Sequence, residues 1–250
     1  YDADIAVFDD LKNFNCAMVF KGGRLVAKEG KALFKTGEKY LPAEVKNTVH
    51  VGNVAPDDFK IKLKGRRANV IRLLKDNVVT EKVVREVESE NGDVKLCGTD
   101  LLKLAVVERH HGTGNIGLGL LEGYGLKNGA IALTIAHDSH NIIVLGDNNA
   151  DMAAAVAELK RIGGGMAIAE GGKAQSLPLD IAGLMSSLPA EEYIAQSEKL
   201  LEKAYSMGVS RDVEAFMSLS FLALLVIPSL KLSDRGLFDA DKFELCSIDA

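Results

Sequence analysis

The chain has 250 residues, of which 47% are hydrophobic and 26% charged, and it carries a formal net charge of −5. This composition is typical of a soluble globular protein, and the negative charge, without a basic stripe, argues against binding nucleic acid. The three cysteines, Cys16, Cys97 and Cys246, are widely spaced and odd in number. They predict neither a disulfide framework nor a thiolate zinc site, and a reducing cytoplasm is the expected location.

Residues 1–55 are predicted to form a short β segment with few helix signals. Its apolar runs, two of them joined by a glycine turn, cover residues 4–8, 16–20 and 24–27. Pro42 and Pro56 bracket a polar connection, so we place a domain boundary near residues 52–62 and divide the chain into 1–55 and 56–250. The sequence begins inside a strand pattern without Met, and we therefore expect it to start within a larger protein.

The second segment is predicted to be an α+β domain with a mostly antiparallel sheet and three to four helices, because strand and helix blocks do not alternate strictly. The expected strands cover residues 68–74, 78–87, 101–107, 131–136, 142–145, 166–169 and 174–177. The expected helices cover residues 150–162, 189–205 and 212–227. Residues 112–125 contain six glycines and suit neither element, and the chain after residue 227 is expected to be polar and irregular.

The most apolar run of the chain covers residues 216–230 and includes Ser218, Ser220 and Pro228. It is shorter than the ~20 residues that a membrane-spanning helix requires. We therefore expect no membrane association, and we predict that the helix over residues 212–227 is buried on almost all sides.

Histidine is concentrated in residues 106–141, which hold four of the five histidines of the chain in two clusters, each after an apolar run. Imidazole suits proton transfer and metal binding near neutral pH, and the glycines between the clusters allow a backbone to approach a ligand closely. The candidate catalytic residues are His110, His111, His137, Asp138 and His140, and the candidate substrate-binding residues are Glu108, Asn115, Ser139 and Asn141. We expect the two clusters to lie close together in the fold.

Each cluster also has a simpler interpretation. Neighbouring strand residues point to opposite faces, so His110 and His111 cannot both face one pocket if the strand continues, and either could simply bond nearby carbonyls. Asp, Ser and Asn in residues 137–141 are ordinary turn formers. The Gly-x-Gly-x-x-Gly string of residues 112–117 lacks the helix that a dinucleotide site requires. The chain also contains neither a Gly-x-Ser-x-Gly elbow nor the signature of the cytidine-type zinc deaminases.

The stretch from Val106 to Met152, VVERHHGTGNIGLGLLEGYGLKNGAIALTIAHDSHNIIVLGDNNADM, closely resembles the C-terminal region of adenine deaminases, which are members of the amidohydrolase superfamily. Residues 163–169 and 177–186 support the resemblance, which covers about residues 1–235, although the position of Asp180 is more often proline in the family. Residues 2–10 resemble the strand with which amidohydrolases resume their small β-sandwich after the catalytic barrel, and residues 21–27 resemble its next hairpin.

The resemblance implies hydrolytic deamination of adenine to hypoxanthine and ammonia, in purine salvage, by a metal-bound hydroxide. The resemblance also implies that the metals are held by a His-x-His pair on the first strand of the catalytic barrel, together with further histidines or a carboxylate. This chain has no His-x-His pair. The manganese or iron centre is therefore expected on a barrel outside this chain, no family metal ligand is expected within it, and the chain alone should be inactive. The implied partners are adenine, the amidohydrolase barrel of the same protein and further copies in a homo-oligomer.

Two alternatives stay open. In the first, residues 56–250 form a structural or oligomerisation module whose histidines bind nothing. In the second, they form a self-contained metal-binding domain that uses His110 or His111 together with His137 and His140.

Overall fold

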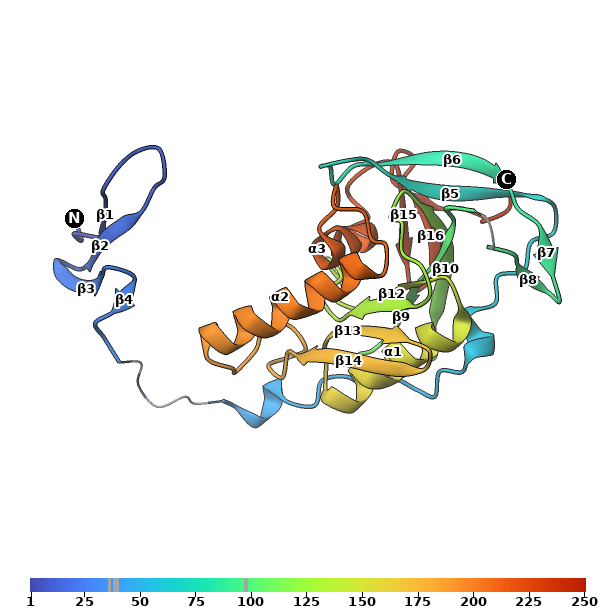
Figure 1. Cartoon of the computed structure of the whole chain (residues 1–250). Helices are drawn as coiled ribbons and strands as arrows, with labels where there is room; N and C mark the ends of the chain where they lie inside the picture. Colours follow the sequence, from blue (N-terminus) through green and yellow to red (C-terminus); the bar gives the residue numbers. More distant parts are fainter. Residues whose placement is uncertain (36, 38–40, 97–98) are drawn as a thin grey trace. The chain divides into compact units, whose positions relative to one another are not determined.

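The computed structural model describes residues 1–35, 37, 41–96 and 99–250, so Cys97 lies outside the described residues. The chain divides into an N-terminal unit, Tyr1–Leu41, and a main unit, Pro42–Ala250 (Figure 1). This division comes earlier than the predicted boundary near residues 52–62. The connection after Pro42 belongs to the main unit because Val51 is buried in its core and the backbone N–H of His50 donates to the carbonyl oxygen of Arg109 at 2.7 Å.

The N-terminal unit is an antiparallel sheet, as predicted, formed by β1 (Ile5–Phe8), β2 (Cys16–Lys21), β3 (Arg24–Lys28) and β4 (Lys31–Ala32). None of its described residues is buried, and apolar side chains such as Ile5, Phe8 and Phe34 are exposed. A small sheet normally needs an apolar face packed on another layer to be stable in water. The assignment of this unit to part of a β-sandwich stays a prediction.

The main unit is built on an eight-stranded sheet in the order β14-β13-β11-β12-β9-β10-β5-β6 (Figure 1). Its strands are β5 (Arg67–Leu73), β6 (Thr80–Glu86), β9 (Leu102–Val107), β10 (Ile116–Glu122), β11 (Ala130–Leu133), β12 (Ile142–Gly146), β13 (Gly165–Glu170) and β14 (Lys173–Pro178). Every neighbouring pair is antiparallel except β10 with β5. The short strands β7 (Ser89–Glu90) and β8 (Asp93–Val94) form a separate pair. The prediction of an α+β fold with a mostly antiparallel sheet is confirmed.

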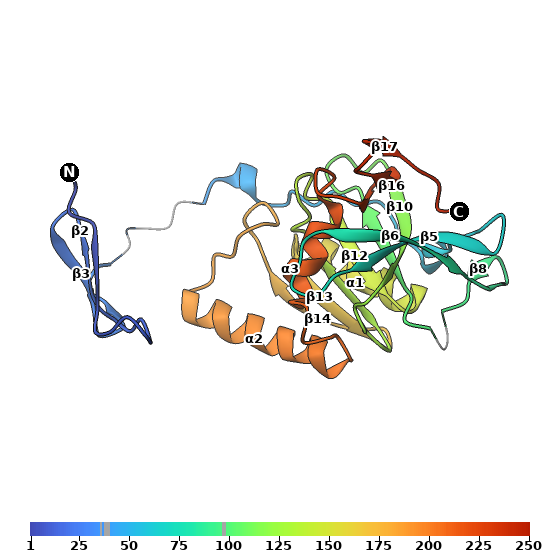
Figure 2. The same ribbon diagram turned by 90° about the horizontal axis from the view of Figure 1, so that it is seen from above.

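Helices cover both faces of this sheet because successive strand residues alternate between two apolar cores. Ala130 and Ala132 pack in the core that contains α1 (Asn149–Ile162), whereas Ile131 and Leu133 pack with α2 (Ala190–Ser206) and α3 (Ala215–Ser220). In Figure 2, α2 lies beside β13 and β14, at the end of the sheet away from β5 and β6. Within the described part of the chain, no helix has both the length and the hydropathy needed to cross a lipid bilayer.

The helix α1 illustrates how local sequence sets an element. The Asn148 side chain accepts a hydrogen bond from the backbone N–H of Asp151 at 2.8 Å and caps the first turn. Gly163 adopts the left-handed conformation that ends the helix, as the sequence predicts. The 3-10 helices η1 (Ala43–Val45) and η2 (Pro56–Phe59) lie in the segment before β5.

Four sequence predictions are corrected. The glycine-rich stretch contains the strand β10, and a Cβ on Gly117 would lie 1.8 Å from the carbonyl oxygen of Ser233, so only glycine lets the two backbones pack this closely. The tail forms a sheet of β15 (Leu230–Ser233), β16 (Gly236–Asp239) and β17 (Glu244–Leu245). The helix predicted over residues 212–227 is only α3 followed by the 3-10 helix η3 (Phe221–Ala223), and Pro228 disfavours helical backbone just before it. This segment is also not buried all round, since Met217 is 61% exposed and Val226 67% exposed.

Candidate functional site

The loop after β9 is organised by Glu108. Its buried carboxylate accepts hydrogen bonds from the backbone N–H groups of His110, His111 and Thr113 at 2.5, 2.8 and 2.9 Å, and from the Thr113 hydroxyl at 3.0 Å. Burial raises the pKa of Glu108, but these hydrogen bonds outweigh it and lower the pKa to about 2. Both carboxylate oxygens are therefore occupied by the loop itself, which gives Glu108 a structural role.

The loop between β11 and β12 carries the second cluster. The backbone N–H of His137 donates to the carbonyl oxygen of Ser220 at 3.2 Å, and the His137 ring lies 5.1 Å from the ring of Phe221 and 5.4 Å from that of His140. Burial, followed by the nearby His137 and Arg109, lowers the pKa of His140 below its ordinary value. The neutral imidazole is the form that can accept a proton.

The structure brings the two loops into contact. The Nε2 atom of His110 lies 2.7 Å from the carbonyl oxygen of Ser139, and the backbone N–H of Arg109 donates to the Asn141 side-chain oxygen at 3.2 Å. The Arg109 guanidinium also donates through Nε to the carbonyl oxygen of His140. The predicted proximity of the two clusters is therefore seen in the fold, whereas the roles assigned to their members stay predictions.

Arg109 is the residue that sequence reasoning missed. It is only 2% exposed, and its Nη2 atom donates to the carbonyl oxygen of Ala182 at 3.2 Å, so one guanidinium ties together the backbones of two loops. Burial lowers the pKa of Arg109, and its Nη1 atom has no hydrogen-bond partner among the described residues. A buried arginine cannot be told from an exposed one in the sequence, so the Glu-Arg-His-His string alone gave no signal of this role.

The remaining candidates differ in accessibility. Side chains that are exposed at the protein surface are those of His110, His111, Asn115, Asp138 and Ser139. Asn115 donates through Nδ2 to the Asp234 carboxylate at 3.4 Å, whereas Asn141 is buried and engaged with Arg109. Of the candidates, the exposed members and the half-buried His137 and His140 are therefore the ones placed to meet a substrate or another part of the protein.

The described part of the chain offers no set of donor atoms that fits a metal ion. Among residues 1–35, 37, 41–96 and 99–250, no three His, Cys, Asp or Glu side chains gather in a way that could hold one. The four clustered imidazoles therefore do not form a metal centre in this structure.

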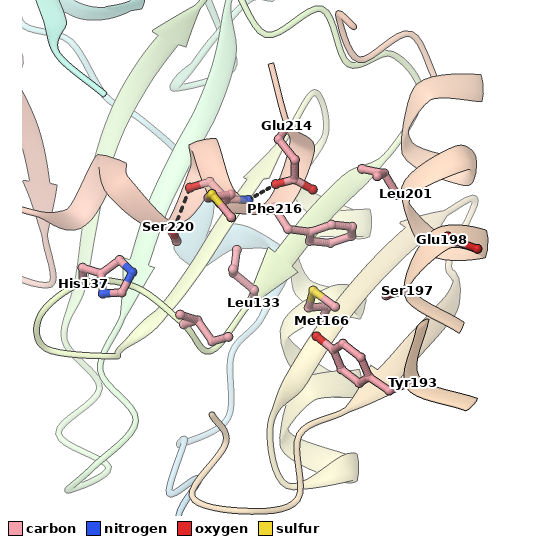
Figure 3. A pocket seen from close by; sticks show the side chains of 12 residues that line it. Leu133, His137, Met166, Tyr193, Ser197, Glu198, Leu201, Glu214, Phe216 and Ser220 are labelled. Carbon is pink, nitrogen blue, oxygen red and sulfur yellow. Dashed lines mark hydrogen bonds between the residues drawn. The ribbon is translucent and has the colours of Figure 1, made fainter. Parts of the chain in front are cut away.

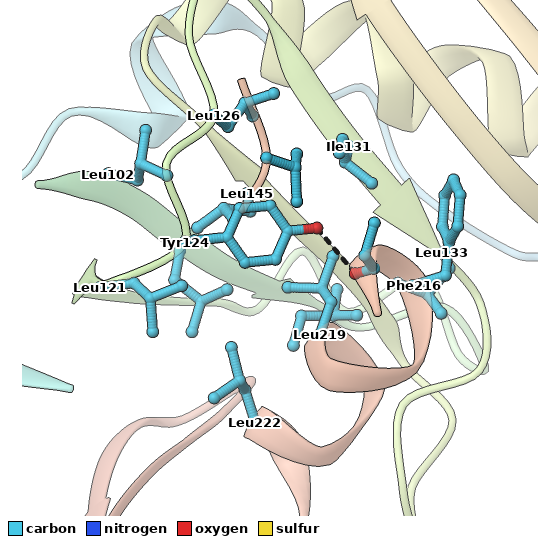
Figure 4. Packing of buried hydrophobic residues seen from close by; sticks show 14 of the residues in the cluster. Leu102, Leu121, Tyr124, Leu126, Ile131, Leu133, Leu145, Phe216, Leu219 and Leu222 are labelled. Carbon is cyan, nitrogen blue, oxygen red and sulfur yellow. Dashed lines mark hydrogen bonds between the residues drawn. The ribbon is translucent and has the colours of Figure 1, made fainter. Parts of the chain in front are cut away.

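A cavity of about 330 Å³ lies beside His137, between the end of β11 and the helices α2 and α3 (Figure 3). Its walls are mainly apolar and include Leu133, Met166 and Phe216. Leu133 and Phe216 belong to the apolar core, in which the Tyr124 hydroxyl donates to the carbonyl oxygen of Ala215 at 2.7 Å (Figure 4). The cavity is thus backed by well-packed structure. Sequence reasoning did not find it because its lining comes from segments that are far apart in the chain.

Comparison with known proteins connects the main unit to one family. A family model described as the adenine deaminase C-terminal domain matches residues 77–244. Adenine deaminase 2 of Carboxydothermus hydrogenoformans is 48% identical over 250 residues, which cover 99% of this chain and 44% of the relative. The adenine deaminases of Nitratidesulfovibrio vulgaris and Clostridium acetobutylicum are 46% and 42% identical, over 98% of this chain and 43% of each relative. The chain therefore spans less than half the length of the curated relatives that it matches.

Proposed function

The chain belongs to the family of adenine deaminase C-terminal domains, and from this premise we propose that it is the C-terminal part of an enzyme that hydrolyses adenine to hypoxanthine and ammonia. The observation that carries the proposal is that relatives named adenine deaminase align with 98–99% of this chain at 42–48% identity. In the same proposal the enzyme is a cytoplasmic amidohydrolase that acts in purine salvage.

The metal of this reaction, manganese or iron, is proposed to lie on an amidohydrolase barrel in a part of the protein outside this chain. The described residues offer no ligand set for it. When bound, the metal would supply the hydroxide that attacks the amino-bearing ring carbon. The barrel of the same protein and further copies of the protein are the proposed partners.

Within this proposal, the two histidine loops add proton-transfer or orienting groups to the reaction. The candidates are His110, His111, His137, Asp138 and His140, with Asn115 and Ser139 as substrate contacts. The geometry supports this role in one respect: Arg109 and the contact between His110 and Ser139 hold the two loops in one fixed arrangement. Preorganised groups of this kind are what general acid–base catalysis requires.

A purely structural role for the same loops is the second candidate. It is favoured by Glu108, Arg109 and Asn141, whose polar groups are mostly used within the protein. Under this alternative the loops only connect strands, and replacement of their exposed side chains should leave catalysis unchanged.

The activity is tested on the purified full-length protein that contains this chain, supplied with manganese or iron. We expect loss of adenine with equimolar formation of hypoxanthine and ammonia. The 250-residue chain alone, prepared free of host deaminase, should show no turnover. Full-length protein that is folded and metal-loaded but leaves adenine unchanged would contradict the proposal, and turnover by the 250-residue chain would contradict the assignment of the metal centre to another part of the protein.

A further inference from the structure

The sequence contains the dipeptide Asn-Gly twice, at Asn91-Gly92 and at Asn128-Gly129. Glycine has no side chain to shield its backbone nitrogen, so in this dipeptide that nitrogen can reach the side-chain carbonyl carbon of the asparagine. Both asparagines adopt positive φ, 52° at Asn91 and 58° at Asn128. Sequence and φ are therefore matched at the two places, and a difference in their chemistry comes from the surrounding structure.

The first of these dipeptides is open to solvent. Asn91 and Gly92 are the two turn residues between β7 and β8, whose ladder pairs Glu90 with Asp93, and both turn residues are exposed. A Cβ on Gly92 would meet the flexible end of the Lys62 side chain at 4.0 Å. A pair of two-residue strands opens readily, because so short a ladder holds few hydrogen bonds. The turn therefore has the freedom to bring the Gly92 nitrogen onto the Asn91 side chain.

The second dipeptide is held in place. The backbone N–H of Gly129 donates to Oδ1 of Asp147 at 2.9 Å, and the same carboxylate accepts from the backbone N–H of Asn128 at 2.5 Å. Gly129 is buried, and a Cβ there would lie 2.4 Å from the carbonyl oxygen of Ala169 and 2.4 Å from Cε of Met207. The Gly129 nitrogen therefore cannot approach the Asn128 side chain without breaking a charge-assisted hydrogen bond and close packing.

We propose that Asn91 is a site of spontaneous deamidation through a cyclic imide, whereas Asn128 is protected. The Gly92 nitrogen loses its proton and attacks Cγ of Asn91. A bond forms between them, the bond from Cγ to Nδ2 breaks, and the amide nitrogen takes up a proton and leaves as ammonia. Water then opens the imide. Opening at Cγ leaves aspartate at position 91, and opening at the backbone carbonyl leaves isoaspartate, so water enters, ammonia leaves and nothing is oxidised or reduced.

The modification acts on a buried ion pair two residues away. The Asp93 carboxylate accepts hydrogen bonds from Nζ of Lys103 and Nδ2 of Asn149, and Lys103 is only 3% exposed. Isoaspartate adds one carbon to the main chain of a two-residue turn, so the pairing of β7 with β8 is lost and the Asp93 carboxylate is displaced. A buried ammonium without its carboxylate is strongly destabilising, and deamidation at Asn91 therefore weakens the fold.

The test follows deamidation in the full-length protein kept in ¹⁸O-labelled water, with the peptides then measured by mass spectrometry. A molecule that deamidates during the incubation gains one labelled oxygen, which separates it from one that deamidates during digestion in ordinary water. We expect Asn91 to convert at least ~10-fold faster than Asn128, the factor set by breaking the charge-assisted hydrogen bond of Gly129. In urea, where both segments are unfolded, the two rates should become similar. Conversion of Asn91 in the folded protein that is as slow as that of Asn128 would overturn the proposal, as would a ratio that urea leaves unchanged.

Two variants test the consequence for stability. Asn91→Gln keeps a neutral amide, but its longer side chain closes an imide ring much more slowly. After the same incubation, the melting temperature of the parent should fall as isoaspartate accumulates at position 91, whereas that of Asn91→Gln should not. Asn47→Gln is the matched control and should age as the parent does, because Asn47 is also exposed with a positive φ of 54° but is followed by Thr48. An equal fall in the parent and in Asn91→Gln would contradict the claimed effect on the fold.

Discussion

The Nε2 atom of His110 lies 2.7 Å from the carbonyl oxygen of Ser139, and this hydrogen bond joins the loop after β9 to the loop after β11. A carbonyl oxygen only accepts, so His110 carries its proton on Nε2 in this arrangement. Two segments that are 29 residues apart are thereby held as one surface that presents His111 and Asp138 to solvent. The contact gives the histidine-rich stretch a defined geometry, whatever chemistry it serves.

Replacement of Glu108 by Gln should destabilise the protein by about 2 kcal/mol at neutral pH, because a charged acceptor of four hydrogen bonds is lost. The folded-state pKa of about 2 lies below the ordinary value of 4.5, so this stabilisation is fully present above about pH 4.5 and is lost as the pH falls toward 2. Urea unfolding of the parent and the variant at pH 7 and near pH 3 measures both effects. A difference that is the same at the two pH values would contradict the prediction, and Glu90→Gln, an exposed residue of β7, serves as the control.

Replacement of Gly117 by Ala should reduce the free energy of unfolding by about 2 kcal/mol or more, the range expected for overpacking. The new Cβ would lie 1.8 Å from the carbonyl oxygen of Ser233 and 2.9 Å from the backbone nitrogen of Gly236, so β10 and the hairpin of β15 and β16 must move apart. Gly65→Ala is the matched control, because nothing lies within 4 Å of its Cβ position. Equal melting temperatures for the two variants would show that the close packing is wrong.

The free energy of unfolding should rise as the pH increases from about 8 to about 10.5, because the buried Lys231 then loses its charge in the folded protein. Lys231 is fully buried on β15, its Nζ atom donates to the carbonyl oxygen of Val78 at 2.8 Å, and burial lowers its pKa from 10.5 to about 8. Between these values the unfolded chain binds the proton that the folded protein releases, so the free energy of unfolding rises with pH.

The same residue can be tested by substitution. Lys231→Met keeps a long flexible side chain without a buried charge, and we expect the variant to be at least as stable as the parent at pH 7. The advantage should shrink as the pH approaches 10. A variant that is ~2 kcal/mol or more less stable at pH 7 in urea unfolding would show that the ammonium group is stabilised in place.

Local sequence patterns predicted most of the strands, and Gly163 predicted the C-terminal end of α1, whereas the Asn148 cap was found only in the structure. They did not predict β10, because its Gly117 is required by close packing against the backbone of Ser233, which lies more than a hundred residues later in the chain. The clustering of the two histidine loops could be expected because both follow buried strands. The burial of Arg109 and the cavity beside His137 could not, since each depends on contacts between distant segments.

The central claim, that the joined histidine loops take part in the reaction of the full-length enzyme, is tested most directly by turnover and melting temperature measured together. The variants are His137→Ala and Asp138→Asn. The controls are His50→Ala and Asp241→Asn, because both side chains are exposed. His50 contacts Arg109 through a backbone hydrogen bond, which the substitution keeps. We expect kcat for adenine to fall at least ~10²-fold in the two loop variants, the size of a lost acid–base or orienting group, with melting temperatures close to those of the controls. Turnover per folded molecule that equals that of the parent would contradict the claim and leave these loops a structural role alone.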